Sequence, residues 1–189
     1  MKKMIVFLTV ATIFWSAQAF SQPVDRLIQS LPLFVGWSSV KAKNETLKIG
    51  VFSDKTSRVD NGLLSKFQKL KPWNHDLVKE FIGHNRIDVI FLNSDNLSDF
   101  DGQIIWVLDA DASLKALRKK TMEGVFTIGA QHQTFEAYIA ATLMYENKSN
   151  DPKVERWRLI RFFGNCEISP LIFSNKLKSK ENFVSKNCQ

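Results

Sequence analysis

Short apolar runs alternate with amphipathic stretches along this 189-residue chain, and this alternation constrains the fold more than any other feature. Residues 47–52 and 87–92 are rich in β-branched and aromatic side chains, which predicts two buried strands, the second being the clearest. Between them, four apolar residues recur at helical spacing and predict one buried helical face: Leu63, Leu64, Phe67 and Leu70. A second helix is predicted over residues 76–82.

The same alternation continues towards the middle of the chain. Three further elements are predicted there: a strand at 104–108, a helix that starts at a cap, Asp109 or Asp111, and ends at Lys120, and a short strand at 124–128. The order strand, helix, helix, strand, strand, helix, strand predicts an α/β fold with a mostly parallel central sheet and flanking helices.

The two ends of the folded region have a different pattern. Residues 137–145 and 156–162 are apolar, strand-forming runs joined by a polar linker, which predicts an antiparallel C-terminal hairpin. Residues 23–30 predict a short helix that Pro32 ends. Since no repeat or low-complexity linker divides the chain, we expect a single domain.

The N-terminus, residues 1–19, has the form of a bacterial signal peptide. A basic start precedes an apolar run at 4–15 that is short for a membrane span, and Ala17 and Ala19 supply the small residues at a cleavage site. We expect cleavage after Ala19, or a few residues later, which leaves residues 20–189 as a periplasmic domain. A retained N-terminal anchor is the other interpretation. Beyond the signal, no second long apolar run predicts a transmembrane segment.

The charge balance indicates which partners to expect. The chain has 26 basic and 19 acidic side chains, a formal net charge of +7. Loss of two lysines with the signal leaves 24 basic and 19 acidic side chains, or +5. Outside the cytoplasm we expect no nucleic-acid partner, and the modest excess indicates solvation or attraction to acidic surfaces.

Cys166 and Cys188 are the two cysteines of the chain. In an oxidising compartment an even pair predicts one disulfide, and two free thiols are the alternative. Closing a loop of about twenty residues would stabilise the fold by roughly 3 kcal/mol in the chain-entropy model.

Motifs for catalysis or cofactor binding are weak in this sequence. Gly36-Trp37-Ser38-Ser39-Val40 matches half of a nucleophile elbow, but Val40 stands where the second glycine belongs, and a strand follows instead of a helix. The sequence has no glycine-rich phosphate loop. The three histidines, at 75, 84 and 132, lack the spacing of a zinc site. We therefore expect no enzyme, no metal and no cofactor.

Two sets of residues remain as weak candidates for binding. Asp54, Asn93 and Asp109 each follow a predicted strand, and ligands of open α/β sheets bind at the carboxyl ends of strands. They predict a small-molecule crevice, or else they serve as helix caps and turn formers. Trp37 and Trp73 lie in predicted loops, where an exposed indole is a candidate partner contact and a buried one anchors its loop.

The order of these features resembles the YfiR-like family of small periplasmic regulators. Phe34-Val35-Gly36-Trp37 stands before the strand at 47–52, much as the family shows Phe-Val-x-Trp-Pro before a Leu-x-Ile-Gly-Val strand. Residues 87–92 and the closing segment at 168–177 are similar as well. Ser38 stands in place of the usual proline.

This resemblance implies a non-enzymatic regulator that forms a homodimer. It implies that the partner is the periplasmic sensor domain of a membrane-bound diguanylate cyclase, which the regulator holds inactive until envelope or redox stress releases it. Two other classes stay open: a small-ligand-binding periplasmic protein, and an envelope enzyme.

Overall fold

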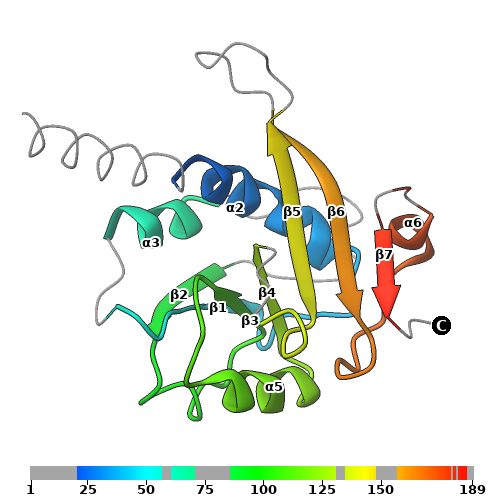
Figure 1. Cartoon of the computed structure of the whole chain (residues 1–189). Helices are drawn as coiled ribbons and strands as arrows, with labels where there is room; N and C mark the ends of the chain where they lie inside the picture. Colours follow the sequence, from blue (N-terminus) through cyan, green and yellow to red (C-terminus); the bar gives the residue numbers. More distant parts are fainter. Residues whose placement is uncertain are drawn as a thin grey trace, which may run out of the picture.

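The computed structural model describes residues 21–56, 61–70, 86–130, 135–147, 157–179, 181 and 183–186. In this part of the chain, seven strands form one sheet in the order β2-β1-β3-β4-β5-β6-β7 (Figure 1). The predicted α/β class, with a mostly parallel sheet and an antiparallel hairpin, is confirmed. The predicted signal peptide, the helix at 76–82, Trp73, the three histidines and Cys188 lie outside the described residues.

The strands have these bounds: β1 (Thr46–Phe52), β2 (Arg86–Leu92), β3 (Ile104–Val107), β4 (Phe126–Ala130), β5 (Ala141–Asn147), β6 (Trp157–Asn165) and β7 (Phe183–Lys186). Strands β2, β1, β3, β4 and β5 run parallel, β6 is antiparallel to β5, and β7 is parallel to β6. The first five strands follow the order 2-1-3-4-5 of doubly wound α/β domains, whose topological switch point lies between β1 and β3.

Strand β2 corrects one prediction. The sequence predicts β2 as the clearest buried strand, yet it lies at the edge of the sheet, and the side chain of Ile90 is 43% exposed. The shorter β3 is buried along its whole length because it lies between β1 and β4. An apolar run predicts a strand but carries no information on where in the sheet that strand lies.

Helices cover both faces of the sheet (Figure 1). The helices have these bounds: α2 (Ser21–Gly36), α3 (Asn61–Gln68), α5 (Leu114–Met122) and α6 (Asn175–Lys178). Side chains of α2, α3 and α6 share one buried cluster with Trp106 of β3, and Leu117 of α5 belongs to a second cluster on the opposite face.

Helix α2 does not end where the sequence predicts. It continues through Pro32 to Gly36, although a proline in a helix removes one hydrogen bond and costs about 3 kcal/mol. The last turn buries Phe34 and Val35 almost completely against the sheet. Burial of these two side chains, worth about 1.5–3 kcal/mol each, offsets the cost of the proline.

The start of α5 also differs from the prediction, because neither Asp109 nor Asp111 is its N-cap. The cap position belongs to Ser113, whose side chain makes no capping hydrogen bond to the helix. Its hydroxyl instead donates to Asp54 over 2.5 Å. After the helix, Gly124 adopts φ +91°, a conformation that glycine tolerates best, and the chain turns into β4.

Candidate functional site

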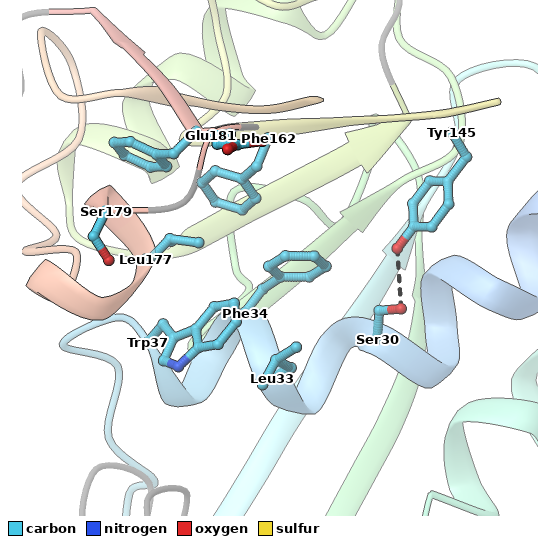
Figure 2. A pocket seen from close by; sticks show the side chains of 10 residues that line it. Ser30, Leu33, Phe34, Trp37, Tyr145, Phe162, Leu177, Ser179 and Glu181 are labelled. Atoms are coloured by element: carbon cyan, nitrogen blue, oxygen red, sulfur yellow. Dashed lines mark hydrogen bonds between the residues drawn. The ribbon is translucent and has the colours of Figure 1, made fainter. Parts of the chain in front are cut away.

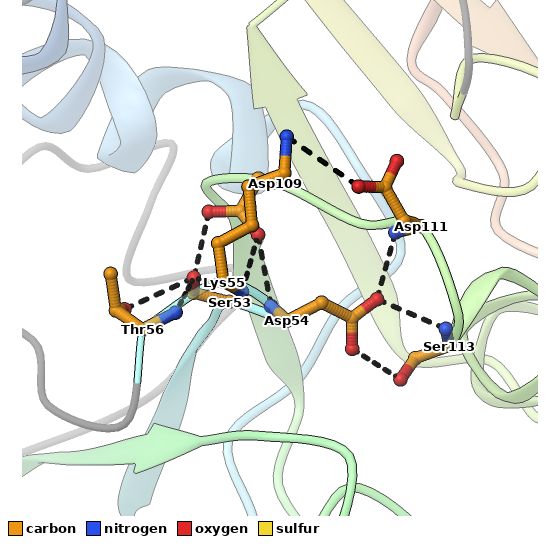
Figure 3. Close-up of polar contacts among 7 residues, drawn as sticks. All are labelled: Ser53, Asp54, Lys55, Thr56, Asp109, Asp111 and Ser113. Atoms are coloured by element: carbon orange, nitrogen blue, oxygen red, sulfur yellow. Dashed lines mark hydrogen bonds and ion pairs between the residues drawn. The ribbon is translucent and has the colours of Figure 1, made fainter.

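The carboxyl ends of β1 and β3 bring together two of the residues that the sequence suggested for a crevice (Figure 3). The Asp109 carboxylate accepts hydrogen bonds from the Ser53 hydroxyl at 2.7 Å and from the backbone N–H groups of Asp54 at 2.9 Å and Lys55 at 3.0 Å. Both of its oxygens therefore hold the loop after β1.

The Asp54 carboxylate makes the reciprocal contacts. It accepts hydrogen bonds from the backbone N–H groups of Asp111 at 2.8 Å and Ser113 at 3.0 Å, and from the Ser113 hydroxyl. Partial burial alone would raise the pKa of Asp54, but these hydrogen bonds outweigh burial and hold it below the usual 3.8. Lys55 pairs with Asp111 over 3.5 Å at the solvent side.

Asn93 does not join this aspartate cluster. Its side-chain oxygen accepts from the backbone N–H groups of Asp95 at 3.0 Å and Asn96 at 3.3 Å, which is an Asx-type turn within its own loop. The carboxylates of Asp54 and Asp109 are thus engaged by groups of the chain itself. Among the described residues, no group of three or more His, Cys, Asp or Glu side chains could hold a metal ion.

A second feature, the aromatic pocket, was not predicted from the sequence. It has a volume of about 470 Å³ and lies between α2 and the strands β5 to β7 (Figure 2). Ten residues line it: Ser30, Leu33, Phe34, Trp37, Tyr145, Phe162, Leu177, Ser179, Glu181 and Phe183. The volume lies in the range of roughly 300–1,000 Å³ that is typical of small-molecule sites.

Aromatic rings form the walls of this pocket. Phe162 stacks on Phe34 with a centroid distance of 5.0 Å and on Phe183 with a distance of 5.6 Å. Trp37 meets Phe34 edge to face at 6.1 Å. Figure 2 shows Leu33 and Trp37 on the α2 side, across from Phe162 and Glu181. The rings are held by one another, so the walls are largely preformed.

Few polar groups reach the pocket. The Tyr145 hydroxyl of β5 donates to Ser30 Oγ of α2 over 3.0 Å, and burial raises the pKa of Tyr145 above 10. Glu181 is exposed at the margin and forms no ion pair with any residue in the described part of the chain. The described lining residues include this one acid and no base.

A third feature lies on the opposite side of the same strands. Met144 is paired with Arg161, and Phe163 with Val184, and strand alternation directs these four side chains away from the pocket. Met144 is 41% exposed and Val184 40% exposed. The Arg161 guanidinium lies 5.2 Å from the centre of the Phe163 ring. We call this set the β5–β7 face.

Helix α5 does not cover the β5–β7 face. This helix packs beside β4, and β5 and β6 extend well past it (Figure 1). An apolar strip with a stacked arginine, which none of the described helices covers, is typical of a contact surface, since arginine and methionine are enriched at interfaces.

The remaining candidates from the sequence have structural contacts. Ser38 donates to the Val35 carbonyl at 2.7 Å at the end of α2, which ends the helix by bonding its last turn. Trp37 is half-buried in the wall of the pocket. The thiol of Cys166 is not free, but Cys188 lies outside the described residues, so the pairing of these two cysteines stays a prediction.

The fold and these features define the class as a single-sheet α/β domain with an apolar pocket. No protein-family model matches the sequence, and the curated proteins compared with it include no match. Within the described residues, no helix has the length and apolar character needed to cross a bilayer.

Proposed function

We propose that this protein is a non-enzymatic periplasmic regulator that docks onto the extracytoplasmic domain of a membrane-bound signalling protein and holds it inactive. The β5–β7 face carries the proposal, because it presents exposed Met144 and Val184 beside the cation of Arg161. The partner surface that fits is apolar at its centre and acidic at its edge.

The class of partner is proposed from the resemblance to YfiR-like regulators. It suggests a diguanylate cyclase whose sensor domain lies in the periplasm, on the same side of the membrane as a secreted regulator. Repression then follows from complex formation, which shifts the partner towards its inactive conformation.

The experiment measures cyclic diguanylate in the native host. Deletion of the gene should raise the level of this nucleotide, and the wild-type gene should restore it. A Met144→Glu/Val184→Glu variant should be secreted at the wild-type level and fail to restore repression, because two buried charges oppose docking. Ile172→Glu is the matched control, since Ile172 is 71% exposed but lies outside this face.

Two results would overturn this proposal. One is full repression by the double variant. The other is a wild-type dimer, measured by sedimentation, that the double variant converts to a monomer, because the β5–β7 face would then join two copies of the chain. The small-ligand alternative is supported by a different observation, the aromatic pocket, and not by the aspartate cluster.

A further inference from the structure

We propose that the aromatic pocket binds a hydrophobic ammonium ion, such as a quaternary or tertiary amine that carries one ring. This inference does not depend on the partner or on the β5–β7 face. It rests on the shape, the ring arrangement and the charge of the pocket.

The ring arrangement favours a cation. Aromatic faces carry negative electrostatic potential, and a cation within about 6 Å of a ring centre gains roughly 0.5–2 kcal/mol, with tryptophan the strongest ring. The pocket is lined by Trp37 and Tyr145 beside a stack in which Phe34 and Phe183 both pack on Phe162, so Trp37 and Tyr145 are the rings that we propose for the cation. Ammonium groups with methyl substituents fit such walls because they have few hydrogen bonds to lose on leaving water.

The charge of the lining points the same way. Glu181 is the acid among the described lining residues, which include no lysine or arginine, and its chain neighbour Lys180 lies outside the described residues. This local balance is opposite to that of the chain, whose formal net charge is +7. An anionic ligand would meet the Glu181 carboxylate with no base among the described lining residues to compensate it, whereas an ammonium ion would gain a direct ion pair.

The position of Glu181 orients the ligand. In Figure 2 Glu181 is drawn on the same side of the pocket as Phe162, across from Trp37 and Leu33. An ammonium group near Glu181 therefore remains close to the ring stack, while the apolar part of the ligand extends towards α2. The Tyr145 hydroxyl is already engaged with Ser30, so it does not compete for the cation.

The test is isothermal titration calorimetry on the purified wild-type protein with benzyltrimethylammonium. Neopentylbenzene is the matched neutral probe, because a carbon replaces the charged nitrogen and the shape is kept. We expect the cation to bind at least about 10-fold more tightly than the neutral probe. Phenylacetate, an anion of similar size, should bind more weakly than either.

Two variants test the residues. Glu181→Gln should weaken binding of the cation by about 3- to 10-fold and leave the neutral probe unaffected, because it removes a partly solvated charge and keeps the shape. Trp37→Leu should weaken binding of the cation more than binding of the neutral probe. Asp99→Asn is the control for Glu181→Gln, since it removes an exposed acid far from the pocket. Thermal unfolding checks that each variant is folded.

Equal affinity for the cation and its neutral isostere would overturn the proposal, and so would an unchanged cation affinity in a folded Glu181→Gln protein. Absence of binding by the folded wild type would also overturn it. The experiment uses only the purified chain and residues of the pocket. Its failure is therefore distinct from failure of the docking proposal, which depends on cells and on the β5–β7 face.

Discussion

Tyr145 and Ser30 connect the two walls of the aromatic pocket through a hydrogen bond of 3.0 Å between their hydroxyl oxygens. Tyr145 belongs to β5 and Ser30 to α2, so this contact joins the first described helix to the second half of the sheet. It fixes the spacing between α2 and β5 where the pocket lies between them.

Tyr145→Phe should lower the free energy of unfolding by about 1 kcal/mol at neutral pH, because it removes one partly buried hydrogen bond and keeps the ring. Tyr138→Phe is the matched control on the second tyrosine of the chain. Urea unfolding of the three proteins measures the difference. Equal unfolding curves for Tyr145→Phe and the wild type would show that the contact adds no stability.

The pH dependence of the same residue has a definite sign. Burial raises the pKa of Tyr145 above 10, so the folded protein holds this proton more tightly than the unfolded chain does. The resulting stability is complete below about pH 10 and is lost as the pH rises through the raised pKa. Tyr145→Phe should remove this contribution to the loss of stability at alkaline pH. Urea unfolding over a series of alkaline pH values measures the difference.

Asp54→Asn should destabilise the protein by about 1–3 kcal/mol at neutral pH, since the carboxylate accepts three hydrogen bonds from the start of α5. Burial opposes the ionised form of Asp54, but those bonds lower its pKa below 3.8. Its contribution is therefore present above about pH 4 and is lost as the pH falls further.

Acid unfolding monitored by circular dichroism tests the prediction for Asp54. The Asp54→Asn variant should lose less stability between neutral and acidic pH than the wild type does. Asp99→Asn, on an exposed loop, should behave like the wild type at both pH values. A variant at Asp54 with wild-type stability throughout would contradict the structural role of the aspartate cluster.

Pro32→Ala should stabilise the protein, by up to about 3 kcal/mol, because alanine restores a backbone N–H donor inside α2 and relieves the clash of the ring. Thermal unfolding of the variant measures the gain. Gln29→Ala, at an exposed position of the same helix, controls for the higher helix propensity of alanine. A lower melting temperature for Pro32→Ala would mean that the proline fits a bend which the pocket requires.

Gly50→Ala in β1 should destabilise the fold by about 1–3 kcal/mol through overpacking. An added Cβ would overlap the Leu92 side chain and come within 3.2 Å of the Phe100 ring. A Gly50→Ala/Leu92→Ala double variant should lose less stability than the sum of the two single losses, because the second change makes room for the first. Additive losses in urea unfolding would show that the overlap is relieved elsewhere.

The sequence predicts most strands because their apolar runs are local signals. It could not predict that β2 lies at the edge of the sheet, since strand order depends on contacts between distant segments. Pro32 misled the prediction for α2, where burial of Phe34 outweighs a local preference. Strand β7 was missed because it is only four residues long and two of them, Ser185 and Lys186, are polar.

The candidate sites were predicted to different extents. The rule that polar residues gather at strand ends correctly brought Asp54 and Asp109 together, because the ends of parallel strands share one edge. No comparable rule finds the aromatic pocket, whose lining comes from α2, β5, β6, β7 and the segment around α6. Trp37 is the one lining residue that the sequence offers as a binding candidate, either as an exposed partner contact or as a buried anchor of its loop.

Cys166 is predicted to form a disulfide bond with Cys188. The segment between them carries Leu177, Glu181 and Phe183 of the pocket, so a cross-link at its ends would restrain one wall. Reduction should lower the free energy of unfolding by roughly 3 kcal/mol in the chain-entropy model. It should also weaken binding of benzyltrimethylammonium, because an ordered wall would then have to form on binding.

Peptide mass analysis without reductant identifies the disulfide bond. The Cys166→Ala/Cys188→Ala variant should have the stability and affinity of the reduced protein, and reductant should change neither. A wild-type protein that keeps both its stability and its affinity after reduction would show that the disulfide does not restrain the pocket.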